Sequence, residues 1–143
     1  SELRLVVGGT GAIKTPRLAG RYANELNAYP SAPAEYAAKL TRARRAASEA
    51  GRDAAALLIS SSGQVVAADS KSEYRDLVAD IAAKTGSDPA EIEREAKKRN
   101  APTGTWDEVR QILNGMEAAG MSRFYFQGKF NPEDIELKLS KLT

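Results

Sequence analysis

The stretch Leu3-Arg-Leu-Val-Val-Gly-Gly-Thr-Gly-Ala-Ile-Lys-Thr-Pro-Arg-Leu-Ala-Gly-Arg-Tyr-Ala-Asn-Glu-Leu-Asn27 decides what fold is expected of this chain. It opens with a short apolar run that contains the β-branched Val6 and Val7, and such a run predicts a buried strand. The run stops at Gly8-Gly9-Thr10-Gly11. The stretch therefore begins as a strand that leads into a glycine loop.

A helix is expected directly after this loop. Thr15 is a good N-cap residue, and Pro16 suits the first helical position. Apolar side chains then recur at intervals of four residues, which predicts one inward-facing side of the helix. These side chains are Leu18, Tyr22 and Leu26.

The order strand, glycine loop, helix suits the binding of an anion such as phosphate. Glycines let the backbone approach a ligand closely, and the free N–H groups at a helix start point towards it. Lys14 adds a positive charge at the same place. An ordinary turn between a strand and a helix is the alternative. The candidate cofactor-binding residues are Gly8, Gly9, Thr10, Gly11, Ala12, Lys14 and Thr15.

Length and composition exclude several classes of protein. The 143 residues predict one domain, over residues 1–143, and 21 basic against 19 acidic residues give a net charge of +2. This balance favours neither nucleic acid nor a membrane surface as the main partner. No cysteine and no histidine are present, so thiolate chemistry and the commonest general base are absent, and we predict no metal site. No long apolar span appears, which makes the cytoplasm the expected compartment.

Further strands and helices alternate along the rest of the chain. Strands are expected at 25–29, within 54–68 and at 123–127, and a loop at 101–104. The region 54–68 fits either one strand bent at Gly63 or two strands joined as a hairpin. Helices are expected at about 33–50, 71–85, 89–99, 106–119 and 132–142. The last of these should turn three residues inward, namely Ile135, Leu139 and Leu142.

Local signals place the ends of these helices. Ser70 with Glu73, and Thr105 with Glu108, have the spacing of capping boxes. Two polar groups have ordinary interpretations as well as functional ones. We interpret the serine run 60–62 as a short turn rather than a ligand contact. We interpret four arginines as a solvated helix face rather than an anion site; they are Arg42, Arg44, Arg45 and Arg52.

Strands that alternate with helices predict a parallel sheet and an α/β fold. About four such strand–helix units are present, which is half of a (β/α)8 TIM barrel of usual length ~250 residues. Active sites of that barrel lie at the carboxyl ends of the strands, where the glycine loop also lies.

Three motifs in order resemble a known family. Residues 8–27 resemble the stretch "GGxGxxxTLRLAARYADEWN" of the luciferase-like oxidoreductases. Gly51-Arg52-Asp53 resembles the family's "AGRDP". Residues 104–125 resemble "GTPEEV…AGVDRFYL". The departures from the first motif are Thr10, Ile13 and Pro16.

This resemblance implies that the chain is the C-terminal half of the barrel, with strands five to eight. The glycine loop would be the cofactor-phosphate loop, with backbone N–H groups of Gly9, Thr10 and Gly11 on the phosphate and help from Thr15 and Lys14. The implied cofactor is coenzyme F-420, with FMN as the alternative, and the implied reaction is hydride transfer or monooxygenation of a small-molecule substrate. Substrate-side and proton-transfer residues of the family lie largely in the N-terminal half, so no catalytic residue is assigned.

A half barrel leaves two strand edges unpaired. We therefore expect this chain to be a natural or proteolytic fragment of a longer oxidoreductase. Its partner should be the missing N-terminal half or a second copy of itself, so a homo-oligomer is expected, and the isolated chain should be inactive.

Two alternatives belong to other classes. One is a half barrel that serves only as a scaffold and associates with itself. The other is a dinucleotide-binding domain, which fits less well because Lys14 stands near the position of the third glycine of its motif.

Overall fold

The computed structural model describes residues 3–128 and 131–143. Its contacts divide the chain into two compact units, each described below by itself. Unit 1 comprises Ser1–Gly63 and Gly115–Tyr125, and unit 2 comprises Gln64–Asn114 and Phe126–Thr143. The single domain expected over residues 1–143 stays a prediction.

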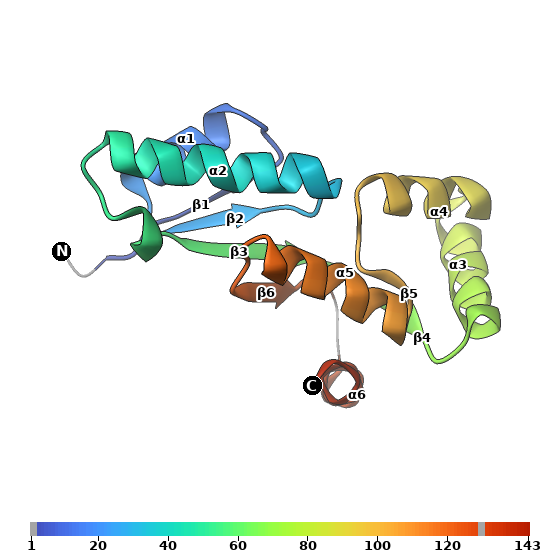
Figure 1. Cartoon of the computed structure of the whole chain (residues 1–143). Helices are drawn as coiled ribbons and strands as arrows, with labels where there is room; N and C mark the ends of the chain where they lie inside the picture. The colour runs from blue at the N-terminus through green and yellow to red at the C-terminus, as the bar shows by residue number, and fades with distance from the viewer. Residues whose placement is uncertain (1–2, 129–130) are drawn as a thin grey trace. The chain divides into compact units, whose positions relative to one another are not determined.

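Unit 1 is built on a four-stranded sheet with the two helices α1 and α2 (Figure 1). Its elements are β1 (Val6–Gly9), α1 (Lys14–Tyr22), β2 (Glu25–Ala28), α2 (Pro33–Glu49), the short 3-10 helix η1 (Ala54–Ala56), β3 (Leu58–Gly63) and β6 (Arg123–Phe126). The last residue of β6 falls in unit 2, and the end of helix α5 (Trp106–Ala118) falls in unit 1.

The strands of unit 1 are ordered β1-β2-β3-β6. β1 runs parallel to β2, and β2 runs parallel to β3, which confirms the parallel sheet predicted from the alternation of elements. Among the described residues, β1 is therefore an edge strand of this sheet. This order argues against the dinucleotide-binding alternative, because that fold places its first strand inside the sheet.

Helices α1 and α2 pack against each other at Gly20. A Cβ atom added there would lie 2.1 Å from the carbonyl oxygen of Ala43 and 2.9 Å from the Cβ of Ala46. Only a residue without a side chain allows the two backbones to approach this closely. The buried side of α1 is thus made by small residues, with Ala19 completely buried.

The inward face expected for the first helix is wrong. Helix α1 ends at Tyr22, so Leu26 lies in β2, where it is buried. Leu18 and Tyr22 are 51% and 63% exposed. Spacing of the large apolar residues misled the prediction, because the close helix contact requires small residues on the packed side.

Unit 2 combines a two-stranded parallel sheet with helices. Its elements are β4 (Val66–Ala68), α3 (Lys71–Thr85), α4 (Pro89–Lys98), β5 (Thr103–Thr105), most of α5 and α6 (Pro132–Leu142). The buried apolar side chains of this unit include Val65, Val78, Ala82, Trp106 and Val109. No helix within the described residues is long and apolar enough to span a membrane.

Two expectations about strands are corrected here. The region 54–68 is neither one bent strand nor a hairpin, because β3 and β4 belong to different sheets. The segment 101–104, expected as a loop, contributes to β5, which pairs with β4. Three-residue strands are too short to give a periodic signal in the sequence.

The local capping signals are confirmed. The Ser70 hydroxyl accepts from the Glu73 N–H while the Glu73 carboxylate accepts from the Ser70 N–H. Gly86 ends the same helix in the left-handed conformation, with φ of 70°. At α5 the Thr105 N–H donates to Glu108 over 2.8 Å, and the Glu108 N–H donates to the Thr105 hydroxyl.

The inward side expected for the last helix is wrong in part. Ile135 and Leu139 of α6 are 42% and 45% exposed. Lysines of this helix make the polar contacts instead: Lys138 donates to the Val65 carbonyl, and Lys141 pairs with Asp69 at 2.7 Å.

Replacing Glu108 by glutamine should remove an acid-dependent part of the stability. The hydrogen bond from the Thr105 N–H lowers the pKa of Glu108 below its ordinary value of 4.5. A carboxyl with a lowered pKa stabilises the folded state fully above the unfolded-state pKa, and this stabilisation is lost as the pH falls through the folded-state pKa. We expect Glu108→Gln to lower the free energy of unfolding by about 0.5 kcal/mol at pH 7, and by progressively less as the pH falls below the ordinary pKa of 4.5.

Urea unfolding at pH 7 and pH 3 measures this difference. Glu117→Gln is the control, because Glu117 is an exposed acid near the other end of α5. Equal effects of the two substitutions at both pH values would contradict the capping role of Glu108.

Candidate phosphate-binding loop

The loop between β1 and α1 is built around one threonine. A Cβ atom added to Gly11 would lie 2.7 Å from the Thr15 hydroxyl oxygen, and one added to Gly9 would lie 3.4 Å from it. Gly9 also has a φ of +154°, which side chains rarely adopt. Both glycines are therefore required for the loop to close over Thr15.

Hydrogen-bond donors accumulate in this loop. Among the residues that the structure describes, no backbone N–H from Gly11 to Thr15 has a hydrogen-bond partner. The Thr15 hydroxyl has none within the same set. The first turn of α1 contains no acidic residue, and Lys14 is exposed at its start. Such an arrangement favours an anion, because unpaired N–H groups and the helix dipole both attract negative charge.

The cap expected for α1 is wrong. The helix begins at Lys14 with Ile13 in the cap position, and no side chain caps it. Pro16 is buried in the first turn instead of opening it. Thr15 is thus free of the capping role, and its hydroxyl faces the glycines.

The structure places the seven predicted site residues in two groups. Gly9, Gly11 and Thr15 lie together, and Thr10, Ala12 and Lys14 complete the same segment. Gly8 is different, since it pairs with Asn27 of β2, and a Cβ on it would lie 3.3 Å from the Asn27 Cβ. Gly8 therefore lies beside Asn27 of the sheet and not in the loop around Thr15.

Arg42 of α2 is a residue of this site, although its sequence pattern was interpreted as part of a solvated helix face. Its Nη1 donates to the carbonyl of Ala12 over 3.0 Å. This bond turns one carbonyl of the loop towards α2, so the carbonyl is held by a positive charge. The basic cluster in the sequence was the only signal for it, and that signal does not say which arginine reaches the loop.

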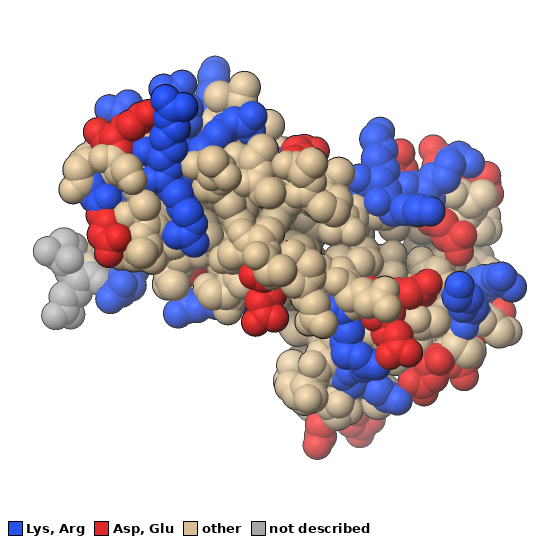
Figure 2. All heavy atoms as spheres, in the orientation of Figure 1, with Lys and Arg blue, Asp and Glu red and all other residues tan. Residues whose placement is uncertain are grey.

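The other arginines of the cluster bind the protein itself. Arg44 donates to the Ala54 carbonyl over 2.8 Å. Arg52 donates to the Gly20 carbonyl near the end of α1 and, over 2.5 Å, to the carbonyl of Ala23, which directly follows this helix. Arg45 pairs with Glu49 on the exposed side of α2, as expected for a solvated helix face. Figure 2 shows several Lys and Arg side chains over α1 and α2, and others over α3 and α4.

The serine run lies in a strand, so its interpretation as a turn is wrong. Ser60, Ser61 and Ser62 all belong to β3, and they are 0%, 0% and 5% exposed. Successive side chains of a strand point to opposite faces. Ser61 faces the helices, where it bonds the Tyr36 hydroxyl over 2.8 Å.

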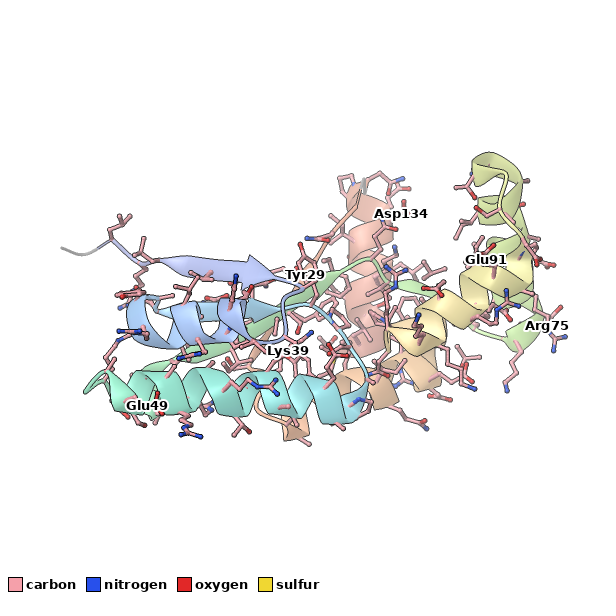
Figure 3. The ribbon with its side chains drawn as sticks, turned by 90° about the horizontal axis from the view of Figure 1, so that it is seen from above. Tyr29, Lys39, Glu49, Arg75, Glu91 and Asp134 are labelled. Carbon is pink, nitrogen blue, oxygen red and sulfur yellow. The ribbon has the colours of Figure 1, made fainter. Side chains whose placement is uncertain are left out.

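Burial is the main cause that raises the pKa of Tyr36 above its ordinary value, against the opposing effect of this hydrogen bond. On the same helix, Lys39 lies on the inner side of α2, as Figure 3 shows. It is almost fully buried and pairs with Glu35 at 3.1 Å, so it serves the packing of the helix.

The opposite face of the unit 1 sheet is polar. Asn27 donates to the Ser60 hydroxyl and accepts from the Ser62 hydroxyl, each over 2.9 Å. Glu25, two residues before Asn27, accepts from the Tyr125 hydroxyl over 3.0 Å and pairs with Arg123. Hydrogen bonds thus join β2 to β3 and β6 on the face not covered by helices α1 and α2.

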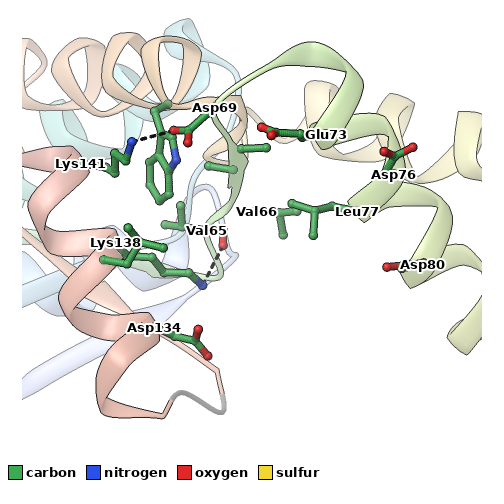
Figure 4. Close-up of a pocket in the computed structure, with 14 residues that line it drawn as sticks. Val65, Val66, Asp69, Glu73, Asp76, Leu77, Asp80, Asp134, Lys138 and Lys141 are labelled. Carbon is green, nitrogen blue, oxygen red and sulfur yellow. Dashed lines mark hydrogen bonds and ion pairs between the residues drawn. The ribbon is translucent and has the colours of Figure 1, made fainter.

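A hollow in unit 2 is a separate candidate (Figure 4). Its volume is about 700 Å³, and Val66, Leu77 and Trp106 contribute to its apolar lining. Several carboxylates also line it, and they are Asp69, Glu73, Asp76, Asp80 and Asp134. Two lysines, Lys138 and Lys141, line the hollow as well, but the five carboxylates outnumber them, so its lining favours an anion less than the glycine loop does.

The comparisons with known proteins identify the fold. The coenzyme F-420-dependent tetrahydromethanopterin reductase of Methanopyrus kandleri matches with a TM-score of 0.64 at 14% identity, over 98% of this chain and 49% of that one. The oxygenating constituent of 3,6-diketocamphane monooxygenase from Pseudomonas putida, in complex with FMN, matches with a TM-score of 0.69 at 20% identity. This match covers 97% of this chain and 46% of that one. An F-420-dependent secondary alcohol dehydrogenase with an F-420–acetone adduct matches with a TM-score of 0.65 at 18% identity. This match covers 100% of this chain and 50% of that one.

The chain thus spans about half the length of these structures. The predicted α/β fold, half of a (β/α)8 TIM barrel, is confirmed. Its four strand–helix units start at β1, β2, β3 and β6, and the segment from β4 to β5 is inserted in the third.

No curated protein matches the sequence. The family model of the luciferase-like monooxygenases matches residues 2–123, which is most of the chain. This chain therefore belongs to the luciferase-like monooxygenase family.

Proposed function

We propose that this chain is the part of a luciferase-like oxidoreductase that binds the phosphate of a flavin or deazaflavin cofactor. The observation that carries the proposal is the run of unpartnered N–H groups from Gly11 to Thr15, together with the Thr15 hydroxyl. In this proposal the chain corresponds to strands five to eight of the barrel. The glycine loop then lies at the carboxyl end of strand five, where barrel enzymes place their sites.

The loop residues have distinct parts in holding the phosphate. Backbone N–H groups of Gly9, Thr10 and Gly11 donate to its oxygens, and Ala12 continues this curve of the backbone. Thr15 adds a hydroxyl donor, and Lys14 neutralises charge. Arg42 keeps the Ala12 carbonyl bonded to α2, so that its negative end does not face the anion.

Coenzyme F-420 is the proposed cofactor, with FMN as the alternative. Each carries a phosphate attached through a ribityl chain to a planar ring, so a phosphate loop suits both. Solved relatives of similar fold contain either an F-420 adduct or FMN. When bound, such a group supplies hydride transfer or, with a flavin and oxygen, monooxygenation. This chain's residues bind and orient it, and no catalytic residue is assigned.

We further propose that the open edge of the sheet needs a partner. Large apolar side chains on and beside β1 and α1 are exposed; they are Leu3, Leu5, Val6, Ile13, Leu18 and Tyr22. β1 is the edge strand they surround. Another half barrel or a second copy of this chain would cover them. This same surface favours the second candidate function, a self-associating scaffold without turnover.

Titration of the purified chain with F-420, FMN and riboflavin tests the cofactor proposal, with fluorescence as the readout and light scattering as the measure of mass. Riboflavin lacks the phosphate, so FMN should bind at least tenfold more tightly than riboflavin. Equal binding of FMN and riboflavin would contradict the phosphate site. A stable oligomer that binds no cofactor would favour the scaffold.

A further inference from the structure

Asn27 lies between two serines on the open face of the unit 1 sheet. Its Nδ2 donates to the Ser60 hydroxyl, and its Oδ1 accepts from the Ser62 hydroxyl, both over 2.9 Å. Ser60 and Ser62 are buried, whereas Asn27 is partly exposed. The two serines therefore fix the plane of an amide that remains accessible.

The amide retains hydrogen-bonding capacity after these two bonds. A side-chain amide has two N–H donors and an oxygen with two lone pairs. One N–H and one lone pair are used, so one donor and one acceptor remain. This pair is complementary to a planar ring edge that carries a carbonyl beside an N–H, as asparagine shows when it pairs with the edge of a base.

Gly8 leaves space above this amide. It lies opposite Asn27 in the parallel pairing, and an added Cβ would come within 3.3 Å of the Asn27 Cβ and 3.7 Å of its Oδ1. The next residue along β1 is Gly9, which borders Thr15. Asn27 thus lies opposite the residue of β1 that directly precedes the start of the phosphate loop.

We infer that Asn27, held by Ser60 and Ser62, binds the carbonyl and N–H edge of the pyrimidine part of the cofactor ring. This inference rests on the proposed function, because it assumes that the glycine loop holds the phosphate of the same ligand. Flavins and deazaflavins share this ring edge. Asn27 therefore contributes recognition of the ring and its orientation, not a choice between the two cofactors.

The test compares ligands that differ at one group each. The affinity for FMN compared with that for riboflavin measures the contribution of the phosphate. The affinity for riboflavin compared with that for N3-methylriboflavin measures the contribution of the ring N–H. The full chain should bind riboflavin about tenfold more tightly than its N3-methyl derivative. Asn27→Leu should weaken the binding of riboflavin and of F-420 about tenfold. It should also abolish the preference for riboflavin over its N3-methyl derivative. Asn114→Leu, at an exposed asparagine of α5, should change nothing.

Asn27→Asp provides a second variant if leucine prevents folding, which circular dichroism would reveal. Both serine hydroxyls can donate to the aspartate, but the ring carbonyl loses its donor, so the preference against N3-methylation should again disappear. Equal affinity of the parent chain for riboflavin and N3-methylriboflavin overturns the inference. So does unchanged affinity of Asn27→Leu for F-420, if only F-420 binds.

One outcome contradicts the phosphate proposal alone: the parent chain binds FMN and riboflavin with equal affinity, while Asn27→Leu still weakens the binding of both. Absence of binding of all these ligands overturns both proposals.

Discussion

Replacing Gly20 by alanine should destabilise the chain by about 1–2 kcal/mol, which is the upper part of the usual overpacking cost less the gain in helix propensity. The added Cβ would lie 2.1 Å from the Ala43 carbonyl oxygen and 2.9 Å from the Ala47 nitrogen, and both of these atoms belong to the backbone of α2. Helices α1 and α2 must therefore move apart, and overpacking of this kind typically costs about 1–3 kcal/mol. The gain in helix propensity from glycine to alanine, about 1 kcal/mol, offsets only part of this cost.

The chain provides a matched control for this substitution. Gly115 lies inside helix α5, and a Cβ added there meets no atom within 4 Å. Gly115→Ala should therefore stabilise the chain by about 0.5–1 kcal/mol through helix propensity alone. Urea unfolding followed by circular dichroism measures both variants. A Gly20→Ala variant as stable as the parent would show that α1 and α2 do not pack as described.

Local patterns predicted much of this fold because their causes are local. Ser70 with Glu73, and Thr105 with Glu108, form capping boxes since each pair lies three residues apart. The alternation of strands and helices predicted the parallel sheet, because a parallel connection requires a crossover. The glycine loop was found for the same reason: strand, glycines and helix follow one another in the chain.

Long-range contacts account for the failures. Ser60–Ser62 look like a turn because three polar residues follow an apolar run, and the Asn27 amide that bonds two of them is more than 30 residues away. Arg42 reaches Ala12 across 30 residues. Leu18 and Tyr22 have helical spacing, yet the contact with α2 was made by small residues. Periodicity identifies an apolar face without saying what covers it.

The identity of the partner stays a prediction, because exposed apolar surface does not specify what covers it. Exposed side chains on β1 and α1 show that apolar surface is uncovered, with Val6 57% and Tyr22 63% exposed. Burial of apolar surface is favourable by about 25 cal/mol per Å², which gives a partner a reason to bind. The same surface suits another half barrel and a second copy equally well. The cytoplasmic location stays a prediction as well.

Replacing Gly9 by aspartate should weaken FMN or F-420 binding at least a hundredfold. The φ of +154° at Gly9 is strained for any side chain, and the added Cβ would contact the Thr15 hydroxyl oxygen at 3.4 Å. The carboxylate would then stand beside the phosphate in the loop. Two like charges about 5 Å apart repel by about 3 kcal/mol at the effective dielectric constant near a protein surface, which corresponds to a factor of more than one hundred.

Two comparisons separate this electrostatic effect from a general loss of structure. Gly115→Asp adds the same charge at an open position of α5, and it should leave the affinity for FMN within about twofold of the parent. Gly9→Asp should also weaken riboflavin much less than FMN, because riboflavin carries no phosphate to repel. Equal losses for the two ligands would mean that Gly9 shapes the ring site or the fold, and the glycine loop would then not be the phosphate site. A large loss confined to FMN and F-420 would support the proposed role of the segment from Gly9 to Thr15.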